Sequence, residues 1–154
     1  MKVLLTVAAL LAASQAQALS CIRPDPVTSF DHANTSVSPY MVMTGTLTAP
    51  PASGMTESKP VSLMAKLTGQ GLAQDGFTAA FDGDVVLQVT CAGPWCGTLP
   101  ASGPVVAFAR IDGEIPVIEM DACGRWLFTA PDQATLDRLT ACMQDGRCSA
   151  QPVQ

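Results

Sequence analysis

The chain has 154 residues with an aliphatic and acidic composition: 48% are hydrophobic, 14% are charged, and the formal net charge is −5 at pH 7. An acidic surface repels phosphate backbones, so we expect no nucleic-acid partner. The hydrophobic content excludes an intrinsically disordered chain, and the length suits one domain with a substantial core.

The amino-terminal segment has the features of a secretory signal peptide. A short positive start at Lys2 precedes an apolar run over residues 3–13. Ala16 and Ala18 then supply the small-x-small pattern that signal peptidase requires. The run is too short for a transmembrane helix, which needs about 20 residues, and no later segment is suitable either. We therefore predict export, with cleavage between Ala18 and Leu19.

Removal of the signal peptide, residues 1–18, would leave residues 19–154 as a single domain in the periplasm or outside the cell. An alternative is an envelope lipoprotein acylated at Cys21, because residues 18–21 (ALSC) form a degenerate lipobox. Two observations weigh against it. Lipoboxes usually have a larger aliphatic residue where Ala18 stands, and acylation would leave an odd number of thiols among the remaining cysteines.

The start of the predicted mature chain is expected to be an extended arm over residues 19–38. Pro24 and Pro26 bias the residues before them away from the helical conformation, and small polar side chains are frequent in the rest. Residues 40–47 follow as a predicted strand, in which Gly45 marks a bulge or a close contact with another strand.

Alternating and aliphatic runs predict four further strands. In residues 61–67 every second side chain is apolar, as in a half-buried strand. Asp112-Gly113 is typical of a hairpin turn, and Pro116 suggests that the strand after it lies at an edge or contains a bulge. The four strands are predicted over residues 61–67, 85–90, 105–110 and 115–120. Segments rich in turn-forming residues separate them: a loop at 50–59, a bend at 69–71, a turn at 82–84 and a tight loop at 93–97.

One helix is predicted after the last strand. Thr129 can cap it, and Asp132, three residues later, completes a start similar to a capping box. Pro131 fits the first turn, and Gly146 ends the helix. Its apolar stripe consists of Leu136, Leu139 and Met143. Five short strands and one late helix favour a mainly β fold, a small closed five-stranded barrel with a carboxy-terminal helix.

The cysteine content predicts a disulfide framework. An even number in a small exported domain is typical of such a framework. A metal site is not expected, because His32 is the only histidine and no CxxC pair occurs. Trp95-Cys96-Gly97 is similar to the motif of thiol–disulfide oxidoreductases, but four residues separate Cys91 from Cys96 instead of two, and no βαβ pattern surrounds the pair. The six cysteines are Cys21, Cys91, Cys96, Cys123, Cys142 and Cys148.

The remaining polar candidates favour structural roles. His32 in a polar arm is expected to be solvated, and Asp82-Gly83-Asp84 lacks the further oxygen ligands that calcium requires. Residues 69–71 lack the strand-to-helix context of a phosphate loop. Glu119 and Asp121 are expected on one solvated face of an edge strand. We therefore predict no catalytic residue, no metal ligand, no cofactor and no enzymatic activity.

Several motifs occur in an order known from one protein family. They are Ser20-Cys21-Ile22-Arg23-Pro24 with Phe30 and Ala33, Thr44-Gly45-Thr46, Cys96-Gly97, residues 105–110 with Asp112-Gly113, and residues 121–126 around Cys123. In this order they resemble the netrin-like module, the OB-type barrel of the tissue inhibitors of metalloproteinases. The likeness spans most of residues 20–128 and implies an OB-like, disulfide-stapled barrel in a bacterial-type exported protein.

The resemblance also implies a disulfide pairing. The family cysteine that corresponds to Cys96 pairs with an amino-terminal cysteine, but Leu19 stands in that position here. Cys96 therefore needs another partner, which Cys91 can supply. The pairs implied by the resemblance are Cys21–Cys123, Cys91–Cys96 and Cys142–Cys148.

The resemblance leaves two functional hypotheses open. In the inhibitors, the amino-terminal cysteine chelates the protease zinc through its amine and carbonyl groups. Leu19 changes that position, so a metalloprotease inhibitor acting through the arm is the alternative. The main hypothesis is a non-catalytic module that binds an unidentified protein through the barrel edge and the arm residues Leu19, Ser20, Ile22 and Arg23.

Overall fold

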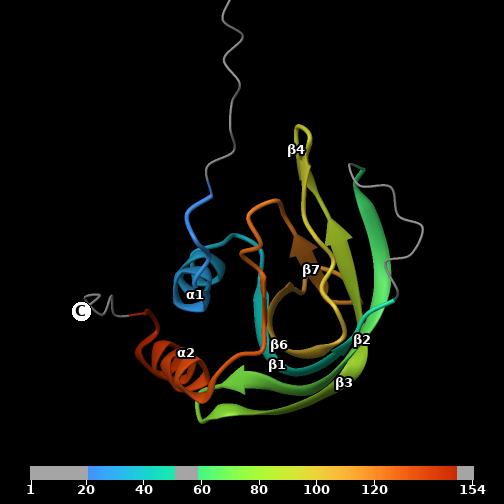
Figure 1. Cartoon of the computed structure of the whole chain (residues 1–154). Coiled ribbons are helices and arrows are strands. Elements are labelled where there is room, and N and C mark those ends of the chain that lie inside the picture. Colours follow the sequence, from blue (N-terminus) through green and yellow to red (C-terminus); the bar gives the residue numbers. More distant parts are fainter. Residues whose placement is uncertain (1–20, 51–58, 149–154) are drawn as a thin grey trace, which may run out of the picture.

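The computed structural model describes residues 21–50 and 59–148 (Figure 1). The predicted signal peptide, the cleavage point between Ala18 and Leu19, and the arm residue Ser20 lie outside these residues. Most of the loop predicted at 50–59 also lies outside them. Within the described part, no helix is both long and apolar enough to cross a membrane.

The expected mainly β fold with a carboxy-terminal helix is confirmed. Helices and strands follow one another as α1 Pro26–Asn34, β1 Tyr40–Thr48, β2 Val61–Ala73, β3 Gly76–Val89, β4 Cys91–Ala92, β5 Trp95–Cys96, β6 Gly103–Arg110, β7 Val117–Met120, β8 Leu127–Thr129 and α2 Gln133–Asp145. The strands predicted at 40–47, 61–67 and 105–110 lie within β1, β2 and β6, and the strand predicted at 85–90 lies in β3 except for Thr90.

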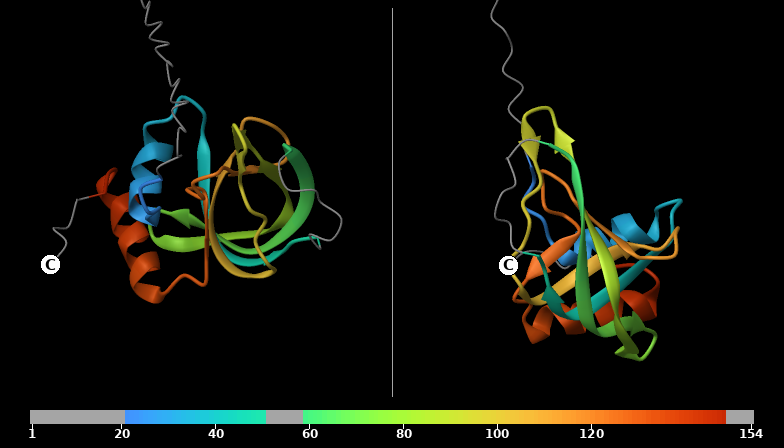
Figure 2. Two further views of the ribbon diagram at one scale, coloured as in Figure 1. Left: turned by 45° about the horizontal axis from the view of Figure 1, so that its top comes forward. Right: turned by 90° about the vertical axis from the view of Figure 1, so that its right-hand side faces the viewer.

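The larger sheet curves until its strands form a hydrogen-bonded circuit. β1 pairs antiparallel with β2 and with β6, β2 pairs antiparallel with β3, and β3 pairs in parallel with β7. A single residue pair, Arg110 with Val117, joins β6 to β7 and completes the circuit β1–β2–β3–β7–β6–β1. β8 pairs with residues 105–107 of β6 along the edge opposite β1, the same edge that meets β7 at Arg110. Figure 2 shows the strands curving around one interior.

β1 and β2 approach each other closely at a pair of glycines. Gly45 and Gly69 lie opposite each other in the register. A Cβ atom on Gly45 would lie 2.7 Å from the Cα atom of Gly69, and a Cβ atom on Gly69 would overlap the carbonyl of Thr44. The close contact predicted at Gly45 is therefore present.

Two predicted breaks in the sheet are wrong. The bend at residues 69–71 lies inside β2, which continues to Ala73, and the turn at residues 82–84 lies inside β3. The pairing explains the second error: Asp82 lies opposite Thr68, accepts a hydrogen bond from its hydroxyl at 3.0 Å, and forms an ion pair with Lys66 at 3.1 Å. These side-chain contacts lower the pKa of Asp82.

The last predicted strand of the barrel is shorter than expected. It begins at Val117 instead of residue 115, so Pro116 precedes it and contributes only its carbonyl, which accepts a hydrogen bond from the Val86 amide at 2.9 Å. Asp112-Gly113 lies in the connection between the antiparallel strands β6 and β7, as predicted. Because β7 pairs with β3 in parallel, it lies between two strands and is not an edge.

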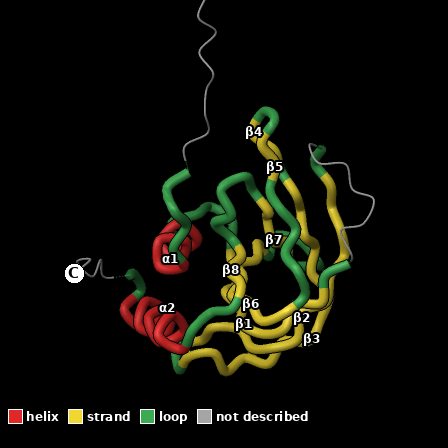
Figure 3. The backbone as a smooth tube through the Cα atoms, viewed as in Figure 1, coloured by secondary structure: helices red, strands yellow, loops and turns green. Residues whose placement is uncertain are grey.

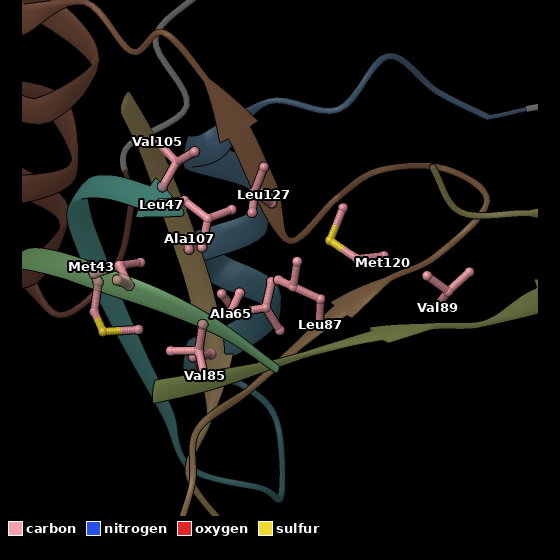
Figure 4. Packing of buried hydrophobic residues seen from close by; sticks show 13 residues of the cluster. Met43, Leu47, Ala65, Val85, Leu87, Val89, Val105, Ala107, Met120 and Leu127 are labelled. Carbon is pink, nitrogen blue, oxygen red and sulfur yellow. The ribbon is translucent and has the colours of Figure 1, made fainter. Parts of the chain in front are cut away.

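Aliphatic side chains fill the interior of the curved sheet (Figure 4). Side chains alternate between the two faces of a strand, so Val105, Ala107 and Ala109 of β6 point inward. Val106 and Phe108 point to the opposite face and belong to a second buried cluster. β6 is thus buried on both faces, which accounts for its uninterrupted apolar sequence.

The second cluster lies between the outer face of the sheet and the two helices, which pack beside each other in Figures 1 and 2. The predicted apolar stripe of α2 is confirmed, with Leu139 fully buried. The predicted cap is wrong: Thr129 belongs to β8, and the N-cap is Asp132, which accepts a hydrogen bond from the Thr135 amide at 2.8 Å. Gly146 ends the helix with a φ of 70°, as predicted.

The arm predicted to be extended over residues 19–38 instead contains α1. Pro26 occupies the first turn, where a missing amide hydrogen costs nothing, and the Asp25 side chain accepts a hydrogen bond from the Val27 amide at 3.4 Å. Phe30 of this helix is buried in the second cluster. Only residues 21–25 of the described arm are extended and precede the helix.

Candidate binding surface

Three disulfides connect the six cysteines of the described residues. Cys21 is bonded to Cys123 across a sequence separation of 102 residues, and the other two bridges span separations of 5 and 6. The pairs Cys21–Cys123, Cys91–Cys96 and Cys142–Cys148 are those implied by the netrin-like resemblance. Three bridges in a chain of this size fit a protein that folds in an oxidising compartment.

The long bridge fixes the extended arm to the turn that follows β7. Cys21 is exposed, and the next side chain, Ile22, is 93% exposed. An aliphatic side chain in that position contributes nothing to the core, since it contacts solvent on almost every side. The arm therefore presents an apolar group from a backbone that is covalently held in place.

Asp121 organises the turn that receives the arm. One of its carboxylate oxygens, Oδ1, accepts hydrogen bonds from the amides of Cys123 and Gly124, at 3.0 and 2.6 Å. The other, Oδ2, accepts a hydrogen bond from Arg125 Nε at 2.7 Å. Gly124 has a φ of 66°, a backbone conformation that glycine adopts without steric cost. Asp121 is therefore a turn-forming residue, and the predicted acidic strand face with Glu119 is wrong, because Asp121 lies beyond the end of β7.

The second protruding segment is the hairpin of β4 and β5. Cys91 and Cys96 lie directly opposite each other in its register and are bonded. Trp95, the residue before Cys96, is 53% exposed. The hairpin thus presents a large aromatic side chain that the core does not use.

The base of the hairpin packs against the same end of β7 that leads into the arm-binding turn. The Gly97 amide donates a hydrogen bond to the Thr90 carbonyl at 3.0 Å, and the Thr90 amide donates one to the Met120 carbonyl at 3.1 Å. A Cβ atom on Gly97 would overlap the Met120 carbonyl oxygen. The hairpin and the arm are therefore both anchored to one short segment, at Met120 and Cys123.

Figures 1 and 2 show the extended arm and the β4–β5 hairpin projecting from the same end of the molecule. We call this end the arm–hairpin surface. It consists of residues 21–25, the turn 121–125 and the hairpin 91–96. The backbone tube in Figure 3 shows that the turn and much of the arm are loops, whereas the hairpin contains short strands.

A pocket of about 240 Å³ lies beneath the arm. Its basic side chains are Arg23, His32 and Arg125, and the rest of its lining is formed by Cys21, Ile22, Pro24, Asp25, Thr28, Ser29 and Cys123. His32 was considered from the sequence, whereas Arg125, Thr28 and Ser29 were not. The Cys21–Cys123 pair implied by the resemblance joins the arm to the turn, but α1, which supplies Thr28, Ser29 and His32, was not predicted.

Other sequence candidates do not assemble into a site. Asp82 and Asp84 belong to an exposed stretch of β3, and the Asp82 carboxylate already contacts Lys66 and Thr68. In the described residues, no group of three or more histidine, cysteine, aspartate or glutamate side chains is placed to hold a metal ion. The predicted arm residues Ile22 and Arg23 do lie together at the arm–hairpin surface, whereas Leu19 and Ser20 lie outside the described residues.

Comparison with models of protein families, with curated proteins and with solved structures gives no match to this chain.

Proposed function

We propose that the protein is an exported, non-catalytic binding module that recognises a protein partner through the arm–hairpin surface. The observation that supports this most directly is the exposure of Ile22 on a disulfide-anchored backbone. Trp95, 53% exposed on the adjacent hairpin, adds an aromatic side chain of the kind enriched in binding interfaces. Neither side chain stabilises the fold to the extent that a buried one would.

Anchoring makes these apolar groups effective in binding. A flexible segment loses conformational entropy when it binds, which weakens the complex. The bridge to Cys123 and the tight packing of Gly97 on Met120 restrict both segments before any partner arrives. A larger share of the contact energy then remains as affinity.

The proposal extends to a netrin-like fold. The circuit of five strands is similar to the partly open, five-stranded barrel of the OB fold. An arm bridged to the turn after the last strand of this circuit is the arrangement that the resemblance implies. These likenesses support the family assignment as a hypothesis.

The test is capture of partners from an envelope extract of the source cells. The wild-type mature protein, with its disulfides intact, is compared with Ile22→Asp and Trp95→Asp. Each substitution introduces a charge at the centre of the proposed contact, where an unpaired buried charge is strongly unfavourable. We expect both variants to lose the partners that the wild type enriches, and a cross-linker placed at residue 22 should identify the same proteins.

Val37→Asp is the matched control for Ile22→Asp. Val37 is also an exposed aliphatic residue, with a relative exposure of 104%, and it lies in the loop between α1 and β1, outside the arm–hairpin surface. Met64→Asp on β2 provides the same comparison for Trp95, because Met64 is 50% exposed. Equal recovery of partners by all four variants and the wild type would contradict the proposal.

The metalloprotease-inhibitor hypothesis requires residues 19 and 20, which lie outside the described residues. It is tested by incubating the mature protein with a panel of zinc proteases, where full activity at micromolar protein excludes it. The lipoprotein hypothesis requires a thioether at Cys21, which is incompatible with the Cys21–Cys123 bond. Intact mass and non-reducing peptide mapping of the native protein distinguish a thioether at Cys21 from the Cys21–Cys123 disulfide.

A further inference from the structure

We propose that the pocket beneath the arm binds a carboxylate, namely an aspartate or glutamate side chain of the bound protein. This inference rests on the proposed function, because it assigns a ligand group to part of the arm–hairpin surface. Its basis is the set of basic and hydroxyl side chains, Arg23, Thr28, His32 and Arg125, that line one pocket.

The donors come from both sides of the pocket. The Arg23 guanidinium and the Thr28 hydroxyl are exposed, and neither has a hydrogen-bond or ion-pair partner among the described residues. Arg125 is exposed as well; its Nε atom donates to Asp121, which leaves its two terminal nitrogens accessible to a ligand. The His32 ring adds a further N–H group to the lining.

The carboxylate and the buried hydroxyl in the lining each have a partner. The Asp25 carboxylate caps α1 through the Val27 amide and lies 3.8 Å from Arg138. The Ser29 hydroxyl, which is buried, donates to the Arg125 carbonyl at 2.6 Å. A ligand that only accepts hydrogen bonds fits this arrangement, and a carboxylate can accept several from guanidinium groups at once.

The charges around the pocket favour a singly charged ligand over a doubly charged one. Arg23 and Arg125 attract an anion, but Asp25 and the adjacent Asp121 offset that attraction, so a dianion such as a phosphate is less well balanced than a carboxylate. The two arginines are also notable in a chain whose net charge is −5, because most of its surface repels acidic groups.

The volume accommodates a side chain. A volume of about 240 Å³ is smaller than the roughly 300–1,000 Å³ of typical cofactor and drug-sized sites. It exceeds the roughly 150 Å³ of a cavity that holds benzene, so one carboxylate side chain fits together with ordered water. The apolar neighbour Ile22 at the rim can contact the residue next to that carboxylate on the partner.

The test is a titration of the mature protein, followed by amide NMR spectra, with N-acetyl-aspartate N-methylamide. The asparagine counterpart, at the same ionic strength, is the neutral probe. We expect saturable shifts at Thr28, Ser29 and Arg125 with a Kd on the order of millimolar, as suits so small a ligand. The neutral probe should cause no saturable shift.

Three variants separate pocket contacts from general electrostatics. Arg23→Gln should weaken the binding of the aspartate probe by about tenfold, the typical effect of losing a charge-assisted hydrogen bond. Thr28→Val should weaken it by about threefold without changing the charge. Lys59→Gln removes an exposed positive charge from the start of the β2 region, outside the pocket lining, and should leave the Kd unchanged.

The outcomes distinguish this proposal from the proposed function. Equal shifts with both probes, or equal weakening by Arg23→Gln and Lys59→Gln, overturn the carboxylate site. If the probe fails to bind while Ile22→Asp still abolishes partner capture, the pocket proposal is wrong and the binding surface stands. If the probe binds as expected while Ile22→Asp and Trp95→Asp both capture partners normally, the pocket binds a carboxylate, but the proposed function is wrong.

Discussion

The bridge between Cys21 and Cys123 should stabilise the fold more than the bridge in the hairpin. In the chain-entropy model, a disulfide acts by restricting the unfolded chain, and its effect increases with the length of the loop that it closes. A separation of 102 residues corresponds to about 4.7 kcal/mol at room temperature. The separation of 5 between Cys91 and Cys96 corresponds to about 2 kcal/mol.

The assay is urea unfolding of the double variants Cys21→Ser/Cys123→Ser and Cys91→Ser/Cys96→Ser. None of these four residues is fully buried, so serine leaves no large cavity in either variant. We expect the first variant to lose more than twice as much free energy of unfolding as the second. Its m-value should also increase, because the unfolded chain without the long bridge exposes more surface. The reasoning is refuted if the hairpin variant loses as much free energy as the long-loop variant.

Three further predictions test the packing and the charges. Gly45→Ala should lower the free energy of unfolding by about 1–3 kcal/mol, because the new Cβ atom has no space against β2. Gly113→Ala is the control and should leave that free energy unchanged, because no atom lies within 4 Å of its new Cβ atom. Equal effects of the two substitutions in urea unfolding would contradict this. Burial raises the pKa of Tyr40, and the nearby Glu119 carboxylate raises it further. Because Tyr40 is the only tyrosine of the chain, an ultraviolet titration should have its midpoint above 10.0, and Glu119→Gln should lower that midpoint. Hydrogen bonds from Thr135 lower the pKa of the Asp132 carboxyl. The carboxylate therefore stabilises the folded protein above the unfolded-state pKa, near 3.8, and this stabilisation is lost as the pH falls through the lower folded-state pKa. Asp132→Ala should therefore have a lower thermal midpoint than the wild type at neutral pH, and the two midpoints should converge in strong acid; a constant difference would count against this.

Strands whose side chains alternate or are uniformly aliphatic could be predicted from the sequence. In residues 61–67 one face packs inward and the other is solvated, so the pattern directly reflects the environment. The aliphatic run of β6 was also sufficient to predict a strand, because both of its faces are buried. In these strands, the choice of an apolar or a polar residue at each position follows whether that position is buried.

The errors occurred where local preferences conflict with the fold. Pro24 and Pro26 suggested an extended arm, although Asp25-Pro26 is also a favourable start for a helix, as α1 shows. Residues 69–71 and 82–84 contain glycines and aspartates that favour turns, yet the pairing of β2 with β3 keeps both segments extended. The pocket could not be predicted, because it joins α1 to a turn about 100 residues later in the chain.

The order of the sulfurs along the chain has a consequence for oxidation during synthesis. A chain made from its amino end presents Cys21 first and Cys91 second, and these two are not native partners. Cys96 follows five residues later, and closing so short a loop costs little entropy, so we expect Cys91 to be consumed by its neighbour before it reaches the distant thiol. Cys21 would then remain reduced until Cys123 emerges. Thiol trapping of nascent chains should detect this sequence of events, and a trapped Cys21–Cys91 species as the main early product would show that the hairpin bond does not protect the native pairing.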